Sequence, residues 1–599
     1  MCGIVGYLGD NKASDIILSG LEKLEYRGYD SCGICLYNQS DQSFVTYKDK
    51  GRVEHLVHDF DYDINNHLAI GHTRWATHGK PNQTNSHPHF SLSKRFSIVH
   101  NGVIENYKEL VSKFIPNTIF ISETDTEVIA NLIELFTETL SVDEAIRKTL
   151  SLIEGSYALL IIDTLSPNII YAAKNKSPLL IGIRKEGITL ASDLMALIGH
   201  ADTYYPIEDK TFTKVEKIGN KYISEMFDII GKPVQFVPLE MNMVLEEIGK
   251  GGYSHYMLKE ICEQPSVIRK IMSKYLIEDQ FTISPKITQM ISAAKRIYII
   301  AAGTSMHAGF VGKYYFENIA NIPTEVFIAS EFAYNMPLLV DNPLFIFISQ
   351  SGETADLRTC LVNVKQLNYP TLTITNVATS TLAREADQFI EIYAGPEIAV
   401  ASTKAYVGQV AILSILAYVV SSKKSFDLKL ELSKVAIAME AIIDKREYIH
   451  RLVQEKITKK SCFYIGRGLD YYTCLEAALK LKEISYIQTE GFAAGELKHG
   501  TIALIEDGIP VVAIISQKII NKNTRSNIRE VLSRGANVLV ISLNNVSDVT
   551  DEIVLVDVHE ILSPLLTVIP TQLIAFYSAL DLNKDIDKPR NLAKSVTVE

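Results

Sequence analysis

The chain has 599 residues, 47% of them hydrophobic and 22% charged, and this composition predicts a globular protein that can build several cores. With domains of roughly 100 to 200 residues, the length corresponds to three or four units. The formal net charge is -11 and the basic residues are scattered along the chain, so no nucleic acid is expected as a partner.

The N-terminus itself is the first candidate site, "MCGIVGYLGD". Removal of Met1 would give Cys2 both a thiol and a free α-amine. Because such an amine has a reference pKa of about 7.7 to 8.0, a useful fraction is neutral near pH 7 and can act as the base for the thiol. The alternative is that Cys2 is a small buried residue at the start of a strand.

Up to about Leu239, short β-branched and aromatic runs alternate with helical stretches, which predicts an α+β domain. Within it, Cys32 and Cys35 have the CxxC spacing of some metal and redox sites. No second Cys/His pair completes a zinc site, and the alternating apolar residues predict a strand instead. We therefore expect no metal and no cofactor.

Three polar segments of this domain supply the groups that an amino-acid amide substrate needs. The guanidinium of Arg74 can bind a carboxylate through paired hydrogen bonds, and the carboxylate of Asp125 can bind an ammonium group. Asn101 and Gly102 form a suitable donor pair for an oxyanion. Each has an ordinary alternative, since Asn-Gly is a common hairpin turn and charged residues occur on any surface.

In chain order, Cys2, "LEYRGYDS", "GHTRWATHG", "HNG" and "SETDTE" resemble the glutaminase domain of the N-terminal-nucleophile amidotransferases. The resemblance implies an α+β (αββα) domain over residues 1–239 that hydrolyses glutamine. It implies Cys2 as the nucleophile and Asn101 and Gly102 as the oxyanion hole. Trp75 resembles a residue that gates the passage of ammonia, with simple packing as the alternative. The implied glutamine-binding residues are Arg74, Thr77, His78 and Asp125.

A polar, glycine-containing passage then predicts a linker at residues 240–279. Beyond it, apolar strands, small-residue loops and helices alternate, which predicts parallel sheets covered by helices. Gly303 and Gly468 follow similar strands 165 residues apart. The strand ends at Ser349 and Ser516 lie 167 residues apart. These offsets indicate a duplicated domain, unless two generic strand-turn-helix units agree by coincidence.

Two loops of this second region are rich in hydroxyl groups. Gly303, Thr304 and Ser305 follow one strand, and "SQSGET" at residues 349–354 follows another, each at a predicted helix start. Backbone amides and the positive end of a helix dipole attract phosphate, and no lysine-bearing nucleotide loop is present. The loops therefore favour a phosphomonoester, although the same hydroxyls could simply cap helices.

These loops and "GPEIAVASTKAY" resemble the sugar isomerase (SIS) family of phosphosugar-binding domains. The resemblance implies two α/β SIS domains with parallel sheets flanked by helices, at residues 280–425 and 450–585. One departure is Ala302, where the family often has cysteine. The implied phosphate contacts are Ser305, Ser349, Gln350, Ser351 and Thr354, with Thr304, Val400 and Ser402 around the sugar.

The whole chain, including a tail at 586–599, resembles isomerising amidotransferases that pass the nitrogen of glutamine through an internal passage to fructose 6-phosphate, giving glucosamine 6-phosphate and glutamate. Lys480 and Glu483 are spaced to share a helix face, where Glu483 can move the C1/C2 proton and Lys480 can stabilise an oxyanion. A solvated surface pair is the alternative. The resemblance implies ring opening by His499 of a neighbouring subunit, hence a homodimer, and a Schiff base at Lys594.

The most apolar stretch, residues 407–420, is shorter than the roughly 20 residues that cross a bilayer, so it predicts a buried helix and no membrane partner. The N-terminus has no signal-peptide pattern. Seven dispersed cysteines favour reduced thiols, so we expect a cytoplasmic protein; they are Cys2, Cys32, Cys35, Cys262, Cys360, Cys462 and Cys474.

Two other classes of protein stay open at this point. An amidotransferase for phosphoribosyl pyrophosphate needs a strand ending in two acidic residues and a hydroxyl-rich loop, and "ALIEDG" at residues 503–508 lacks the loop. A phosphosugar-binding regulator would bind its ligand without turnover. The presence of Cys2, Glu483, His499 and Lys594 argues against a regulator, and no DNA-reading domain is recognised.

Overall fold

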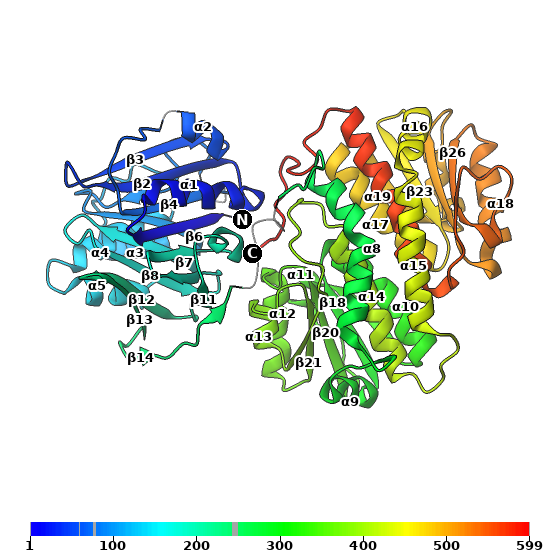
Figure 1. Cartoon of the computed structure of the whole chain (residues 1–599), viewed down its shortest axis with the longest axis horizontal. Helices are drawn as coiled ribbons and strands as arrows, with labels where there is room; N and C mark the ends of the chain where they lie inside the picture. Colours follow the sequence, from blue (N-terminus) through cyan, green and yellow to red (C-terminus); the bar gives the residue numbers. More distant parts are fainter. Residues whose placement is uncertain (1, 59, 76–78, 242–248, 598–599) are drawn as a thin grey trace. The chain divides into compact units, whose positions relative to one another are not determined.

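The computed structural model of the chain describes residues 2–58, 60–75, 79–241 and 249–597. Two compact units make up the chain, Met1–Glu247 with Ser595–Glu599, and Ile248–Lys594 (Figure 1). Each unit is described by itself.

The first unit contains two antiparallel sheets. The eight-stranded sheet has the order β15 (Leu239–Glu240), β11 (Thr203–Pro206), β9 (Leu180–Arg184), β10 (Gly187–Ala191), β1 (Gly3–Gly9), β4 (Leu68–Arg74), β2 (Ser31–Asn38), β3 (Ser43–Lys50). The seven-stranded sheet has the order β14 (Pro233–Val234), β13 (Lys221–Asp228), β12 (Thr211–Ile218), β8 (Ile169–Asn175), β7 (Gly155–Asp163), β6 (Phe96–Ile104), β5 (His89–Phe90).

Strand β1 shows how the layers of this unit are built. Its residues alternate between two faces, and all of them are buried. Val5 and Tyr7 belong to the core that the first sheet shares with α1, whereas Ile4 and Leu8 belong to the core between the two sheets. The helices are α1 (Ala13–Leu24), α2 (Val53–His58), α3 (Tyr107–Phe114), α4 (Thr126–Phe136), α5 (Val142–Leu150) and α6 (Leu194–Leu197).

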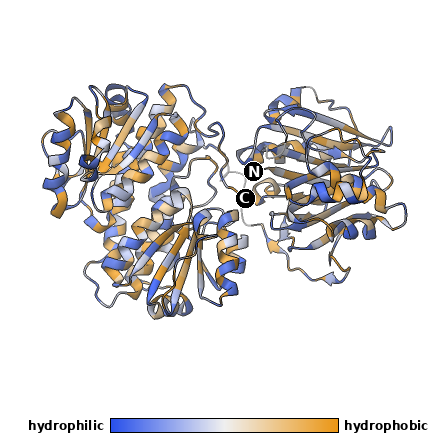
Figure 2. Cartoon of the chain, turned by 180° about the vertical axis from the view of Figure 1, so that it is seen from behind, coloured by the Kyte–Doolittle hydropathy of each residue, from blue (hydrophilic) through white to orange (hydrophobic). Residues whose placement is uncertain are grey.

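The second sheet is covered on its other face by α3, α4 and α5, which share a third core with β6, β7 and β8. The order helix, sheet, sheet, helix confirms the predicted αββα class. Figure 2 shows the hydrophobic residues concentrated in the strands and on the helix faces that pack against them. Cys32 and Cys35 lie buried on β2 as free thiols, which confirms the predicted strand.

The second unit contains two five-stranded parallel sheets with the same strand order, which confirms the predicted duplication. In each, the first strand of the copy lies between the second and the third. The first sheet runs β19 (Thr324–Ile328), β18 (Arg296–Ala301), β20 (Pro343–Ser349), β21 (Thr371–Thr375), β22 (Gln388–Glu391). The second runs β24 (Gln488–Ala493), β23 (Ser461–Gly466), β25 (Pro510–Ile515), β26 (Asn537–Leu543), β27 (Ile553–Leu555).

Helices flank both sheets, and a short hairpin of β16 (Leu276–Ile277) and β17 (Gln280–Phe281) precedes the first. The helices are α8 (Tyr256–Tyr275), α9 (Pro285–Ala293), α10 (Gly303–Tyr315), α11 (Ala329–Phe332), α12 (Ala355–Gln366), α13 (Thr381–Glu385), α14 (Lys404–Val420), α15 (Leu428–Ile443), α16 (Arg446–Lys456), α17 (Leu469–Ser485), α18 (Asn521–Leu532) and α19 (Ser563–Asp581).

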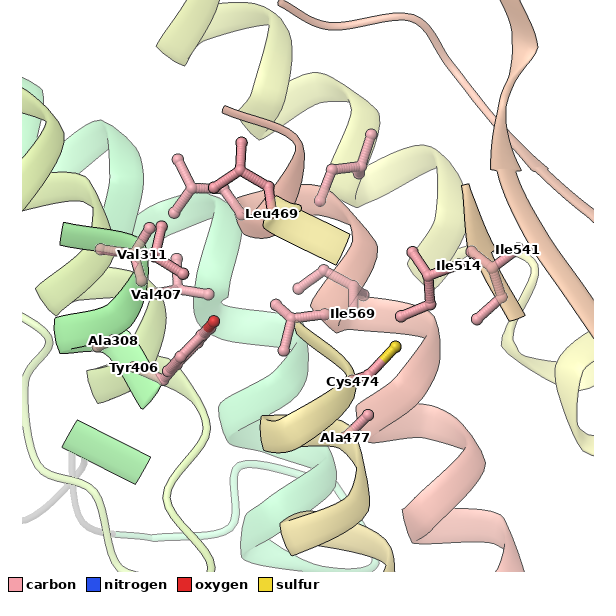
Figure 3. Packing of buried hydrophobic residues seen from close by; sticks show 14 of the residues in the cluster. Ala308, Val311, Tyr406, Val407, Leu469, Cys474, Ala477, Ile514, Ile541 and Ile569 are labelled. Atoms are coloured by element: carbon pink, nitrogen blue, oxygen red, sulfur yellow. The ribbon is translucent and has the colours of Figure 1, made fainter. Parts of the chain in front are cut away.

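One continuous core joins the two copies of the duplicated domain. Figure 3 shows Val311 of α10 and Val407 of α14 on the side of the first copy, with Ala477 of α17 and Ile569 of α19 on the side of the second. Helix α14 is buried along most of its length, as the apolar run at 407–420 predicts. The two copies therefore pack as one body rather than as separate domains on a tether.

One helix in the part of the chain that the structure describes, Glu560–Asp581, is long and apolar enough to span a membrane. In its apolar window 94% of the residues are buried inside the fold. This segment is accordingly a core helix of the second unit, with its apolar residues in contact with α17 and α16.

The predicted linker differs from the structure in one respect. Its residues 242–248 lie outside the described residues, but residues 256–275 form the 20-residue helix α8. Met257, Ile261 and Ile268 have helical spacing and enter the core of the second unit. The polar and glycine residues before them obscure that periodicity in the sequence.

Candidate active sites

A small pocket in the first unit brings the predicted glutaminase residues together. Cys2 lies directly before β1, Arg74 ends β4, and Asp125 stands before α4. Because Gly3 pairs with Thr73 across β1 and β4, the backbones of Cys2 and Arg74 lie close together. The pocket is lined by Cys2, Arg74, Trp75, His87, His100, Gly102, Thr124, Asp125 and Thr126, which include five predicted residues.

The thiol of Cys2 is held by the backbone of Trp75. The N–H of Trp75 donates to Sγ at 3.1 Å, and Sγ lies 3.5 Å from the carbonyl oxygen of the same residue. Burial raises the pKa of the Cys2 thiol. The thiol therefore needs a nearby base to become a nucleophile at neutral pH, and the α-amine exposed by removal of Met1 would be such a base.

Asn101 and Gly102 lie on β6 beside Cys2. The side-chain amide of Asn101 donates to the carbonyl oxygen of Cys2 at 2.9 Å, and its Oδ1 lies 3.0 Å from Nε2 of His72. Gly102 has a φ of 134°, and a Cβ there would lie 2.0 Å from the carbonyl oxygen of Ser156. The position thus requires glycine. The pair sits where donors for an oxyanion at Cys2 would be needed.

Arg74 and Asp125 are opposite charges in the same pocket, and both are buried. Burial lowers the pKa of Arg74, and the negative charge of Asp125 is among those that oppose this effect. One carboxylate oxygen of Asp125 accepts the N–H of Ile104 at 2.7 Å, which fixes the side chain. The other predicted glutamine-binding residues, Thr77 and His78, lie outside the described residues.

Four histidines that the sequence analysis did not single out lie beside this pocket, and all are buried. His72 stacks on His87 with ring centroids 4.1 Å apart, and His89 meets His87 edge-on at 4.6 Å. Burial lowers the pKa of His72 to about 3 and those of His87 and His89 well below the ordinary value. These three rings are therefore neutral hydrogen-bonding groups, and His72 holds the amide of Asn101. The fourth, His100, lies beside them on β6.

The two loops predicted to bind phosphate leave one edge of the first parallel sheet. Ala301 at the end of β18 pairs in register with Ile348 near the end of β20. Loops 303–305 and 349–354 therefore emerge side by side at the carboxyl ends of the strands, where ligands of α/β sheets bind. Each leads into a helix, α10 or α12, whose N-terminus favours an anion.

The second of these loops is ordered by its own hydroxyl groups. Oγ of Ser349 lies 2.9 Å from Oγ1 of Thr354 and accepts the N–H of Gly352 at 3.0 Å. Oγ of Ser351 accepts the N–H of Glu353 at 3.2 Å, and the carbonyl oxygen of Gln350 accepts the N–H of Asn376, outside the loop, at 3.1 Å. Residues 349–354 therefore form one compact turn before α12.

Ser305 and Thr304 connect the first loop to two other helices. Oγ of Ser305 accepts a hydrogen bond from the side-chain amide of Gln409 on α14 at 3.0 Å. Oγ1 of Thr304 donates to Oε1 of Glu476 on α17 at 3.2 Å. Ala302 stands at the N-cap of α10 and gives no side-chain cap. The predicted sugar-phosphate residues of the first copy thus reach a helix of the second.

The tail lysine lies in the same region of this unit. Nζ of Lys594 donates to the carbonyl oxygen of Ala399 at 2.8 Å and to the carboxylate of Glu397. Glu397 also accepts the hydroxyl of Ser402 at 2.9 Å. Burial alone would raise the pKa of Glu397, but the ammonium of Lys594 and several hydrogen bonds outweigh it and lower that pKa. Val400 is buried beside them.

Lys480 is buried and pairs with the half-buried Glu483, so the two do not form a solvated surface pair. Nζ of Lys480 lies 2.6 Å from Glu483 and 3.6 Å from Glu476, and the lysine side chain is 1% exposed. Burial opposes the charge of Lys480, but Glu483 and Glu476 outweigh it and raise its pKa. The charge of Glu397 also acts on Lys480, so this cluster adjoins that of Lys594.

Glu397 and Glu476 were not predicted from the sequence, although Glu476 stands four residues before Lys480 on α17 and shares its helix face. His499 is exposed at the end of a 3₁₀ turn, Glu496–His499. Among the residues that the structure describes, no group of three or more His, Cys, Asp or Glu side chains is placed to hold a metal ion.

Comparison with known protein families agrees with these two clusters. A model of the glutamine amidotransferase domain matches residues 52–244, and a model of the SIS domain matches residues 290–419 and 457–581. The fold and the sites therefore define a glutamine amidotransferase domain joined to two SIS domains.

Full-length relatives give the particular family. The chain is 53% identical over 607 residues to the glutamine–fructose-6-phosphate aminotransferase (isomerizing) of Listeria innocua, covering 100% of both chains. It is 52% identical over 606 residues to the protein of the same name from Bacillus cereus, again covering 100% of both. The chain belongs to the family of isomerizing glutamine–fructose-6-phosphate aminotransferases.

A solved structure supports the assignment. The C-terminal domain of glucosamine-fructose-6-phosphate aminotransferase from Francisella tularensis aligns with a TM-score of 0.55 at 36% identity, covering 57% of this chain and 99% of that one. The full-length identity to isomerizing aminotransferases decides against both alternatives that the sequence left open, the phosphoribosyl pyrophosphate enzyme and the non-catalytic regulator.

Proposed function

We infer that this chain hydrolyses glutamine and uses the ammonia to convert fructose 6-phosphate to glucosamine 6-phosphate. The observation that carries this conclusion is the presence in one full-length family member of both the Cys2 pocket and the buried Lys480–Glu483 cluster. Incubation of the protein with both substrates tests it. We expect glutamate and glucosamine 6-phosphate in equal amounts, and glutamate without any hexosamine phosphate would contradict the proposal.

In the glutaminase reaction, the Cys2 thiolate attacks the amide carbon of glutamine, with the α-amine of the processed chain taking the thiol proton. Asn101 and Gly102 stabilise the oxyanion. The amine returns the proton to the leaving nitrogen, ammonia departs, and water hydrolyses the thioester to glutamate. Arg74 and Asp125 hold the carboxylate and ammonium ends of the substrate, with Thr77 and His78 as further contacts. The opposite charges in the pocket support these roles.

In the sugar reaction, the phosphate binds to Ser305, Ser349, Gln350, Ser351 and Thr354, while Thr304, Val400 and Ser402 surround the sugar. His499 opens the ring, and the amine of Lys594 forms a Schiff base with the C2 keto group, releasing water. Ammonia then replaces the lysine at C2. Glu483 moves a proton from C1 to C2 while Lys480 stabilises the oxygen at C1. The ion pair between the buried Lys480 and the half-buried Glu483 supports these two roles.

Ammonia travels between the two sites through a closed passage, with Trp75 as its gate. A closed passage is needed because ammonia released into water would be protonated and diluted, and would then be a poor nucleophile. The hydrogen bond from the backbone of Trp75 to Cys2 supports the choice of this residue.

The assembly, the compartment and the domain boundaries are further parts of this proposal. We propose a homodimer in which His499 serves the partner's site, because in a single chain this residue is exposed. Seven free thiols support a cytoplasmic location. The boundaries are 1–239 for the glutaminase domain, 240–279 for the linker, 280–425 and 450–585 for the SIS domains, and 586–599 for the tail.

A further inference from the structure

Glu260, in the second turn of α8, is a buried carboxylate that the proposed reaction does not use. It is 2% exposed. Its Oε1 accepts the N–H of Ala399 at 3.1 Å and that of Ile398. Its Oε2 has no hydrogen-bond partner in the part of the chain that the structure describes. A buried carboxylate oxygen without a hydrogen-bond partner costs free energy of folding, so we expect this carboxylate to have a role that offsets the cost.

The hydrogen bonds of Glu260 lead directly to Lys594. Ala399, whose N–H is held by Glu260, offers its carbonyl oxygen to Nζ of Lys594 at 2.8 Å. Glu397, the carboxylate that pairs with Lys594, lies at the start of the same short segment. The position of both acceptors of the lysine amine therefore depends on the anchoring of residues 397–399 by Glu260.

The tail that carries Lys594 is attached to the same helix. The carboxylate of Asp587 accepts the N–H groups of Tyr256 and Met257, each at 2.9 Å, at the N-terminus of α8. The carbonyl oxygen of Asp587 accepts the N–H of Val400 at 2.9 Å. A negative charge at a helix N-terminus is favourable, so this docking is stable. The first two turns of α8 thus hold both the tail, through Tyr256 and Met257, and the receiving segment, through Glu260.

The charges around Glu260 come from three elements. They are Lys594 on the tail, Glu397 on the segment before α14, and Lys404 in the first turn of α14. Burial raises the pKa of Glu260 to about 8, with Lys594 opposing and Glu397 adding to the rise. Glu397 is already engaged by the backbone N–H groups of Thr403 and Ala405 and by Lys594. Of the two carboxylates, Glu260 is therefore the one that gains its charge only as the pH rises through about 8.

We propose that Glu260 is a positioning residue for Lys594: it anchors the segment that receives the amine, and its charge sets the pH at which that amine becomes free. An ammonium group must lose its proton before it can attack a keto carbon. A nearby negative charge favours the protonated form, so removal of that charge frees the amine at lower pH. The catalytic consequence rests on the proposed role of Lys594.

The test is reductive trapping of fructose 6-phosphate on the full-length protein with cyanoborohydride, without glutamine, over a range of pH. Labelled Lys594 is quantified by mass spectrometry of the tail peptide. In Glu260→Gln the side chain keeps an acceptor for Ile398 and Ala399 but cannot become charged. We expect the two trapping profiles to coincide below about pH 8, where Glu260 is itself protonated, and Glu260→Gln to trap up to about tenfold faster above that pH, because only the glutamate becomes charged there. Glutamate release from glutamine is expected to stay unchanged.

Glu440→Gln is the matched control, because Glu440 on α15 is an exposed carboxylate that pairs with Arg269 of α8, which is none of the three charges named above. We expect its trapping profile to coincide with that of the unsubstituted protein. Glu260→Ala removes the acceptor itself, and we expect trapping to fall at least about tenfold at every pH while glutamate release persists.

The outcomes test the control of pH by Glu260 separately from its anchoring role. Coincident profiles for Glu260→Gln and the unsubstituted protein above about pH 8, or an equal increase in Glu440→Gln, would overturn the assigned control of pH. Undiminished trapping in Glu260→Ala would overturn the anchoring role. A label on a different lysine in the unsubstituted protein would instead refute the proposed Schiff base at Lys594, and this inference with it.

Discussion

At the residue scale, burial changes the protonation of the groups around Cys2. It raises the pKa of the thiol and lowers those of His72, His87 and His89, so these imidazoles are weak bases. A thiol that resists ionisation needs a base of suitable strength within reach. The α-amine of a chain that begins at Cys2 meets this need within the same residue.

Replacing Cys2 by alanine tests the nucleophile. We expect Cys2→Ala to lower glutamate release by more than about 1000-fold, because no other described group of the pocket can form the thioester. Trapping of fructose 6-phosphate should persist, since it uses the other unit. Cys262→Ala, at a half-buried thiol on α8, is the control and should release glutamate normally. Rapid glutamate release by Cys2→Ala would refute the assignment.

Replacing Glu483 by glutamine tests the proton transfer in the sugar reaction. Loss of an acid–base group of this kind costs about 100-fold or more, so we expect Glu483→Gln to form glucosamine 6-phosphate at a hundredth of the normal rate or less. Glutamate release should continue. Lys482→Gln changes the exposed neighbour that points away from the cluster and should be fully active. Equal loss of activity in both variants would show that the effect is not specific to Glu483.

At the element scale, the duplicated sheets explain why the predicted phosphate site lies in the first copy. Ser305 in the first turn of α10 and Asp470 in the first turn of α17 are 165 residues apart, the same offset as their preceding glycines. In the second copy the carboxylate of Asp470 accepts the N–H of Ser516 at 2.9 Å and also its hydroxyl. In the second copy, the N–H and the hydroxyl of Ser516, which could otherwise donate to a phosphate, are therefore already engaged by Asp470.

Asp470 gives the second copy a pH-dependent stability. Burial raises its pKa from 3.8 to about 7. Because the folded chain holds this proton more tightly than the unfolded chain does, the contribution is complete below the ordinary value and is lost as the pH rises through about 7. The change is on the order of a few kcal/mol.

Thermal unfolding at pH 5 and pH 8 measures this contribution. We expect the unfolding temperature of the unsubstituted protein to fall more between these two pH values than that of Asp470→Asn, whose side chain cannot ionise. Asp444→Asn, at an exposed helix end, should behave like the unsubstituted protein. An identical pH dependence in all three proteins would rule out the buried carboxyl group as its source.

The elements also show what the sequence alone could predict. Local patterns predicted the alternation of strands and helices, the duplication, the buried helix α14, and the pairing of Lys480 with Glu483. The helix α8 was missed because glycine and polar residues precede its apolar positions. Glu397 was missed for a different reason: it meets Lys594 across 197 residues of chain, and no spacing signals such a contact.

At the scale of the whole molecule, the proposed assembly makes one site depend on two chains. If His499 acts in the partner's site, a mixed dimer of Glu483→Gln and His499→Ala contains one site with both substitutions and one site with neither. Co-expression of these two inactive variants should then restore about a quarter of normal activity, because about half of randomly formed dimers are mixed. Absence of any recovery would show that His499 acts within its own chain.

The central claim is that nitrogen moves from glutamine, released by Cys2, to carbon C2 of fructose 6-phosphate without mixing with the solvent. The most direct measurement uses glutamine labelled with ¹⁵N in its amide group, in a large excess of unlabelled ammonium salt, followed by mass spectrometry of the glucosamine 6-phosphate formed. We expect a product that carries ¹⁵N almost throughout. A product that carries mainly unlabelled nitrogen would contradict this claim.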